Sequence, residues 1–126
     1  MINQVVTKDA PDAIGPYSQA MISGNMVFTS GQIPISPGTG VMVDGGIAEQ
    51  TEQVMRNIGA VLAAAGAGFD TVVKTTCYLS DMANFQTFNE VYAKYFASSP
   101  ARSCIAAKAL PKDAMVEVEA IALISR

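Results

Sequence analysis

The last quarter of the chain, residues 100–124, most strongly limits what this sequence can fold into. It holds two runs of β-forming residues joined by a short Pro-Lys-Asp turn, and this pattern predicts a β-hairpin. Side chains alternate along a strand, so each run has two distinct faces. One face of the second run is apolar throughout: Val116, Val118, Ala120, Ala122 and Ile124. The opposite face mixes two carboxylates with apolar residues: Met115, Glu117, Glu119, Ile121 and Leu123.

This mixed face is neither a typical solvent face nor a typical core, and a second layer that covers it explains it best. Fully buried strands usually belong to sheets that are covered on both sides. The 126 residues are expected to form a single domain, so a second copy of the same chain is a simple cover. We therefore predict a subunit interface at this face, with Arg102 and at least one of the two carboxylates in a polar pocket within it.

The composition fits a protein that buries surface on folding and again on assembly. Half of the residues are hydrophobic and 15% are charged, which is below the usual share of about a quarter. The net charge of −3 argues against nucleic acid or an anionic membrane as a partner. The sequence has no apolar run that would span a bilayer and no signal-peptide pattern, so we expect a soluble, cytoplasmic protein.

The sequence contains no histidine, which excludes Ser-His and Cys-His nucleophile pairs and every histidine-based metal site. The two cysteines, Cys77 and Cys104, lie on separate predicted strands and make no zinc motif. We expect both to be reduced thiols. Any chemistry must therefore rest on arginine, carboxylates, hydroxyls, amides, backbone groups and water.

Hydrophobic periodicity predicts the remaining elements. The strands expected before the C-terminal pair are 2–7, 18–22, 26–30 and 70–79, of which the second and third form a hairpin. The helices expected are 47–65 and 81–97, while 31–34 leaves the sheet and 35–46 is a surface loop. Two helices against one face of a mixed sheet of about six strands make an α+β sandwich of two layers. Symmetric self-association is the usual way to cover the other face.

Four motifs follow one another along the chain: IGPYSQA at 14–20, TSGQIP at 29–34, PARSCI at 100–105 and EVEAIA at 117–122. With these motifs the whole chain resembles the Rid family, also called the YjgF or reactive intermediate deaminase family. The resemblance implies a chorismate-mutase-like fold in a homotrimer, whose sheets form a central barrel with clefts between neighbouring subunits. It also implies hydrolysis of enamine and imine acids, such as 2-aminoacrylate and 2-iminobutanoate, to 2-keto acids and ammonia, without a cofactor.

The resemblance also assigns residues to the cleft. Arg102 resembles the arginine that binds the substrate carboxylate, and Glu117 resembles the glutamate that positions a water molecule. Five further positions resemble cleft residues of the family: Tyr17, Ser30, the backbone N–H of Gly31, Asn89 and Cys104. The segment 97–99 is shorter than in many members, which bears on the shape of one cleft wall.

These residue types suit the chemistry of a 2-imino acid, which has a planar carboxylate beside an electrophilic carbon. A guanidinium binds a carboxylate through two parallel hydrogen bonds, and lysine does this less well. An imine is already activated, so an oriented water and a carboxylate that moves its proton suffice without a covalent nucleophile. We therefore hypothesise that Arg102 orients the substrate and that Glu117 acts on the attacking water.

Other interpretations stay open on the residues alone. Arg102 could be a surface ion-pair residue, Cys104 a buried inert thiol, and Glu119 a structural partner beside Glu117, which only the motif distinguishes. A regulator that binds 2-keto acids without turnover would need the same arginine cleft. A ribonuclease or translation inhibitor, an activity assigned to some family members, fits an acidic chain without histidine poorly. A chorismate-mutase-like pericyclic site would need more cationic groups.

Overall fold

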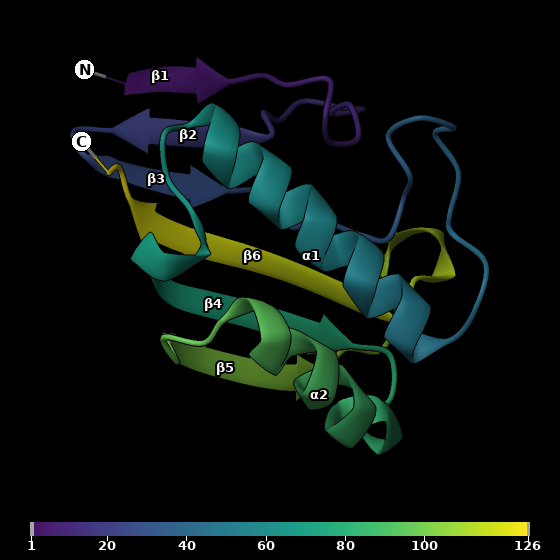
Figure 1. Ribbon diagram of the computed structural model, residues 1–126. Coiled ribbons are helices and arrows are strands. Elements are labelled where there is room, and N and C mark those ends of the chain that lie inside the picture. Colours follow the sequence, from purple (N-terminus) through teal and green to yellow (C-terminus); the bar gives the residue numbers. More distant parts are fainter. Residues whose placement is uncertain (1, 126) are drawn as a thin grey trace.

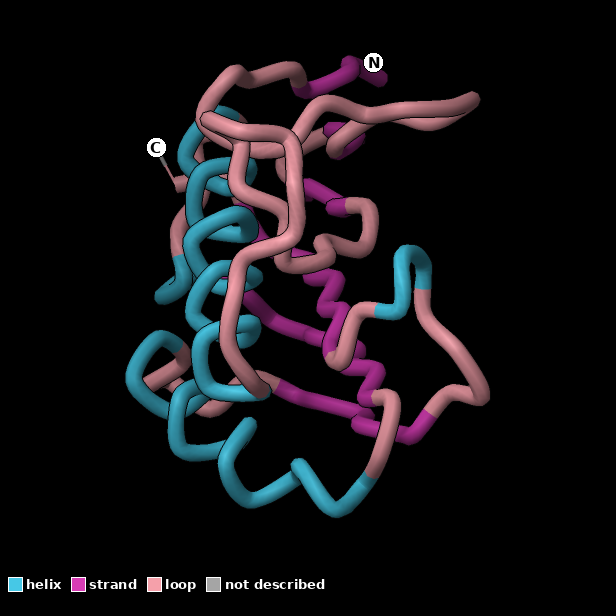
Figure 2. Tube along the Cα trace, turned by 90° about the vertical axis from the view of Figure 1, so that its right-hand side faces the viewer, coloured by secondary structure: helices cyan, strands magenta, loops and turns pink. Residues whose placement is uncertain are grey.

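The computed structural model describes residues 2–125 as one six-stranded mixed sheet with two helices (Figure 1). In chain order the elements are β1 Ile2–Val5, β2 Ala20–Ser23, β3 Met26–Thr29, α1 Ile47–Ala64, β4 Val72–Leu79, α2 Phe85–Tyr95, β5 Ala101–Ala106 and β6 Val116–Leu123. Short 3-10 helices precede β4, α2 and β6, at Phe69–Thr71, Met82–Asn84 and Pro111–Asp113. Viewed from the side in Figure 2, α1 and α2 lie on one face of the sheet. The predicted α+β sandwich of two layers is therefore confirmed.

The predicted C-terminal hairpin is wrong. The strand order is β1-β2-β3-β6-β4-β5, so β4 lies between β5 and β6. β5 pairs in parallel with β4 after the α2 crossover, whereas β6 runs antiparallel to both β3 and β4. The physical reason is the connection 107–115, which is longer than a hairpin loop and carries the chain past the end of β4. The hairpin of β2 and β3 is confirmed.

The segment that was expected to leave the sheet after β3 stays beside it for one further residue. The backbone N–H of Gln32 donates to the carbonyl of Val118 at 2.8 Å, and the N–H of Val118 donates back to Gln32 at 3.2 Å. The loop that follows lies at the surface as predicted, since residues 37–41 and 44–46 are exposed, but Ile35 is buried and bridges to Met42. This short extension of the sheet brings residues 30–32 against β6.

The core lies between the helices and the apolar face of β6, as the alternation predicted. Val116, Val118 and Ala122 are fully buried there, and Ala120 is nearly so. From α1 the stripe of fully buried residues comprises Val54, Met55, Ile58, Val61 and Leu62. Full burial of each large side chain contributes roughly 1.5–3 kcal/mol, so this contact is the main source of stability.

The opposite face of the sheet carries exposed apolar side chains. Phe28 of β3 is 41% exposed, Ile105 of β5 is 54% exposed and Leu123 of β6 is 39% exposed. The carboxylates of Glu117 and Glu119 lie on the same face, half-buried. Apolar side chains gathered on one face of a sheet mark an interaction surface. Within residues 2–125, no helix has the length and apolar character needed to cross a membrane.

Gln19 fixes the long segment that joins β1 to β2. Its side chain is only 4% exposed, and its amide oxygen accepts a hydrogen bond from the Thr7 N–H at 2.7 Å. Its amide nitrogen donates to the carbonyls of Thr7 at 3.0 Å and Pro11 at 2.8 Å. One buried amide therefore satisfies several backbone groups and holds 7–11 against the end of the sheet.

We expect Gln19→Leu to lower the free energy of unfolding by about 1–3 kcal/mol, because it leaves buried backbone groups without partners. Urea denaturation followed by circular dichroism measures the change. Gln4→Leu, on the exposed part of β1, is the matched control and should stay within about 0.5 kcal/mol of the wild type. Equal midpoints for the two variants would show that Gln19 does not hold the segment.

Candidate functional site

One group of predicted site residues gathers where β3 ends beside β6. Ser30 follows β3, and its hydroxyl donates to the carbonyl of Ser18. At Gly31 a Cβ atom would lie 2.0 Å from Oε2 of Glu117, so the glutamate side chain rests directly against the glycine backbone. Tyr17 follows a turn in which Gly15 has φ +131°, and its N–H donates to the Gly15 carbonyl at 2.9 Å. The structure therefore brings Ser30, Gly31 and Glu117 together.

A second group lies where β5 meets α2. Nη1 of Arg102 donates to Oδ1 of Asn89 at 2.7 Å. The guanidinium carbon lies 4.8 Å from the ring centre of Tyr92 and 5.5 Å from that of Phe85. Stacking on two aromatic rings and one hydrogen bond to the side-chain amide of Asn89 hold the planar guanidinium in a fixed orientation. A guanidinium has five N–H donors, and this orientation leaves donors available for a planar carboxylate.

Arg102 and Glu117 lie on opposite faces of the sheet within one chain. Arg102 pairs with Thr75, which is buried beneath the helices, and cross-strand neighbours share a face. Glu117 pairs with Tyr78, three residues further along β4, and therefore points to the other face. The predicted pocket with Arg102 and a carboxylate belongs to a subunit interface, and within one chain these two residues do not come together. A site that uses both residues needs two copies.

The surroundings of Glu117 strengthen the affinity of its carboxylate for a proton. It is half-buried, and burial raises the pKa of its carboxyl group above the ordinary value, with the nearby charge of Glu119 adding to the rise. The hydroxyl of Tyr78 donates to Oε1 of Glu119 at 3.1 Å, so Glu119 has a structural partner. A carboxylate with a raised pKa accepts protons more readily near neutral pH.

The cysteines show no sign of an activated thiolate. Burial raises the pKa of Cys104 despite the opposing effect of Arg102, so a neutral thiol predominates at neutral pH. Its neighbour across the strands, Cys77, is fully buried, and burial raises its pKa to about 12. Both thiols are free, in agreement with the expected reduced state. Cys104 lies two residues after Arg102 on β5, on the same face of the strand, and its substrate-binding role stays a prediction.

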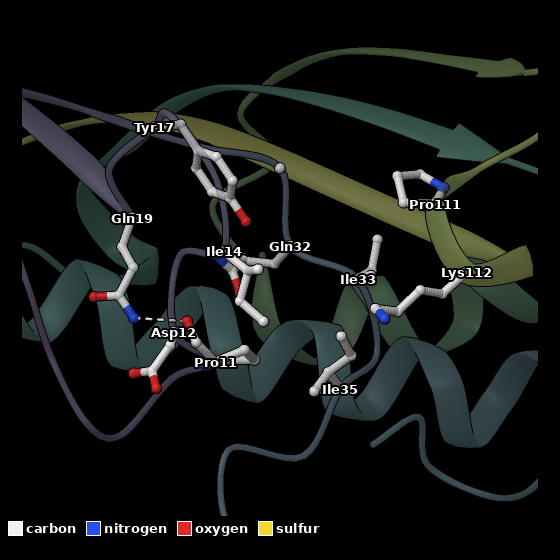
Figure 3. Close-up of a pocket in the computed structure, with 11 residues that line it drawn as sticks. Pro11, Asp12, Ile14, Tyr17, Gln19, Gln32, Ile33, Ile35, Pro111 and Lys112 are labelled. Atoms are coloured by element: carbon white, nitrogen blue, oxygen red, sulfur yellow. Dashed lines mark hydrogen bonds between the residues drawn. The ribbon is translucent and has the colours of Figure 1, made fainter. Parts of the chain in front are cut away.

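A cavity of about 340 Å³ opens beside the first group (Figure 3). Tyr17 and Gly31 line it together with residues that the sequence did not single out: Ile14, Ile33, Ile35, Pro111 and Lys112. Ile14 and Ile33 belong to the IGPYSQA and TSGQIP motifs, and this membership could have identified them as candidate site residues. The aromatic contacts of Arg102 were not predicted, because hydrophobic periodicity does not show which aromatic side chains of a helix also meet a cation. Phe88 is indeed fully buried, but Phe85 and Tyr92 also face the guanidinium.

Comparison with known proteins agrees with the motifs. A family model described as Endoribonuclease L-PSP matches residues 7–124. A RutC family protein from Pyrococcus horikoshii is 53% identical over 119 residues, which cover 94% of each chain. The human 2-iminobutanoate/2-iminopropanoate deaminase is 46% identical over 125 residues, covering 98% of this chain and 91% of the human protein. The crystal structure of E. coli TdcF with bound serine matches with a TM-score of 0.92 at 41% identity, covering 98% of this chain and 99% of that one.

The match extends from the segment before β2 to the end of β6, so it includes both groups of site residues. Identities above 40% over nearly the full length exceed what a shared fold alone would require. This chain belongs to the Endoribonuclease L-PSP family, which is also called the Rid or YjgF family.

Proposed function

We propose that the protein is a hydrolase that converts 2-imino and enamine acids to 2-keto acids and ammonia. The observation that carries the proposal is the pair of complementary groups on one chain. Arg102, held by Asn89 and two aromatic rings, suits a planar carboxylate. Glu117, held against Gly31 with a raised pKa, suits a water molecule that must lose a proton. The name of the human relative and the serine bound to TdcF agree with a small substrate that has a carboxylate.

The two groups are proposed to meet between neighbouring copies of the chain. The contact joins two different patches, the β5 edge that carries Arg102 and the Glu117 face, so it is heterologous. Heterologous contacts that close give rings. A ring of three copies, as the family resemblance implies, would also cover the apolar side chains of Phe28, Ile105 and Leu123. We therefore propose a homotrimer with a site in each cleft.

In the proposed mechanism, the guanidinium of Arg102 binds the substrate carboxylate and fixes the C=N carbon beside a water molecule. Glu117 takes a proton from this water as its oxygen bonds to the carbon, and the C=N nitrogen then accepts this proton, which gives a carbinolamine. Glu117 next takes the hydroxyl proton of the carbinolamine and passes it to the amino group, the C–N bond breaks, and ammonia leaves as the C=O bond of the keto acid forms. Every atom of the products comes from the imino acid and one water molecule, and no electrons are transferred, so this route needs no redox cofactor.

Two alternative functions explain fewer of these observations than the deaminase does. A regulator that binds 2-keto acids would explain the Arg102 group but not the position and pKa of Glu117. The endoribonuclease activity in the family description would have to work on a phosphate backbone with a net charge of −3 and without histidine. We therefore favour the deaminase, acting on small metabolites.

A coupled assay tests this proposal. A threonine dehydratase generates 2-iminobutanoate, semicarbazide competes for it, and the release of 2-oxobutyrate is followed by absorbance. We expect the wild-type protein to accelerate keto acid release and to lower the yield of semicarbazone, whereas albumin at the same concentration has no effect. If release is not accelerated while 2-oxobutyrate still binds in calorimetry, the protein is a regulator and the deaminase proposal fails.

A further inference from the structure

The cavity beneath Tyr17 has more room than the smallest imino acids need. Its volume is about 340 Å³, whereas an apolar cavity of about 150 Å³ is enough to hold benzene. The side chain of 2-aminoacrylate is a single methylene group, and that of 2-iminobutanoate is an ethyl group. We propose that this cavity is a specificity pocket, in which Ile33 and Lys112 select imino acids with larger, uncharged apolar side chains. This inference rests on the proposed deaminase function.

The position of the cavity connects it to the proposed reaction site. Gly31 lines the cavity and also contacts the Glu117 side chain. In Figure 3 the Tyr17 ring lies over the cavity with its hydroxyl group pointing inward. A substrate carbon beside Glu117 would therefore have the cavity mouth next to it, on the side of residues 31–35. The substituent on that carbon is the amino-acid side chain.

The walls of the cavity are apolar where this substituent would lie. Ile33 and Ile35 come from the segment after β3, and Ile14 comes from the turn before Tyr17. Ile14 is 80% exposed, so an apolar group that covers it removes apolar surface from water. Each methylene group buried in this way contributes about 0.8 kcal/mol. Longer apolar side chains are therefore expected to bind better than short ones.

Two buried amides hold the walls in place before any ligand arrives. Gln19 fixes the segment 7–11 on one side. On the other side Nδ2 of Asn57, from α1, donates to the carbonyls of Ile33 at 3.1 Å and Ile35 at 3.0 Å. Asn57 is almost fully buried, and Nε2 of Gln53 donates to its Oδ1 at 2.9 Å. A pocket formed in advance loses little free energy to ordering when it binds a side chain.

Of the two charged side chains that line the cavity, that of Lys112 acts against a cationic substrate side chain. Lys112 extends toward Ile33 and Ile35 in Figure 3 and brings its ammonium group to the cavity. The carboxylate of Asp12 also lines it, but this group lies 4.0 Å from the ammonium group of Lys8. Lys112 would therefore repel the side chain of an imino acid made from arginine. Uncharged apolar side chains avoid this repulsion.

The test compares imino acids that an L-amino acid oxidase makes from leucine with 2-aminoacrylate as the small substrate. Ile33→Phe fills the cavity, so the ratio of kcat/KM for the leucine imine to that for 2-aminoacrylate should fall about tenfold or more. Val41→Phe is the matched control on the exposed loop and should keep the wild-type ratio. An unchanged ratio in Ile33→Phe would overturn the pocket. Inactivity of the wild type on both substrates would overturn the deaminase proposal itself.

A second variant tests the charge and does not depend on how Ile33→Phe folds. Lys112 has φ +56°, a left-handed conformation that asparagine tolerates, so Lys112→Asn should fold normally. We expect the ratio of kcat/KM for the arginine imine to that for the leucine imine to rise about fivefold or more. If this ratio does not change, Lys112 is not a specificity residue.

Discussion

Replacing Arg102 with lysine is expected to lower kcat/KM for imine hydrolysis at least about a hundredfold, which corresponds to roughly 2.7 kcal/mol. Lysine keeps the charge but loses the planar fork that binds both carboxylate oxygens. It also loses the flat surface that stacks on Tyr92 and Phe85, so its position is no longer fixed. Initial rates over a range of imine concentrations measure the change, with the larger part expected in KM.

Arg56→Lys is the matched control for this substitution. Arg56 is exposed on α1, away from both groups of site residues, so the same chemical change should leave kcat/KM at the wild-type value. Circular dichroism verifies that both variants are folded. Wild-type kinetics in Arg102→Lys would contradict the carboxylate-binding role, because a lysine at this position cannot reproduce the two-pronged contact.

Replacing Glu117 with glutamine is expected to lower kcat by roughly 10²- to 10⁴-fold, the usual contribution of a general base. The amide keeps the size and the contact with Gly31 but cannot accept a proton from water. Binding of 2-oxobutyrate should change little, because Arg102 remains. The coupled assay gives kcat, and calorimetry gives the dissociation constant. A kcat near the wild-type value would remove Glu117 from the mechanism.

Glu119→Gln is the matched control, and it also predicts a pH effect. Glutamine can still accept the hydrogen bond from Tyr78, so kcat at its pH optimum should stay close to that of the wild type. The base form of Glu117 exists above its pKa, so activity is lost as the pH falls through that value. The charge of Glu119 helps to raise the pKa of Glu117. Removing this charge should shift the acid limb of the pH profile to lower pH.

Mixing two inactive variants tests whether both residues act in one site. If Arg102→Ala and Glu117→Ala chains are unfolded together and refolded, each mixed trimer should regain one intact cleft. Random assembly of equal amounts then restores about a quarter of the wild-type activity. Each variant refolded alone is the control. No recovery in trimers of verified mixed composition would show that the two residues do not meet between subunits.

The faces of individual strands could be predicted from the sequence, because alternation is a local property. Alternation places Val116 and Val118 on an apolar face and Glu117 on the opposite face, and in the structure the two valines are fully buried while Glu117 pairs with Tyr78 on the other face. The relation between strands could not be predicted in the same way. Whether β4 enters between β5 and β6 depends on the length of the connection and on pairing far apart in sequence. The hairpin prediction failed for this reason.

The same limit explains the part of the site that the sequence missed. Arg102 and Glu117 were predicted to share a pocket at a subunit interface, but their placement on opposite faces of the sheet depends on the register of each strand against β4. Gln19 and Asn57 are polar residues whose partners lie up to 24 positions away, and their roles as wall anchors depend on tertiary contacts. The motifs pointed to Gln19 without indicating what it does.

The opposite placement of Arg102 and Glu117 on one sheet also has a consequence for newly made chains. A single chain carries each half of the proposed site, but the two halves lie on opposite faces of the sheet, so one chain alone is not expected to turn over the substrate. We therefore expect the specific activity to decline on dilution, as the proposed assembly dissociates. The total activity would then rise more than linearly with the amount of protein synthesised, because each cleft forms only when neighbouring chains associate.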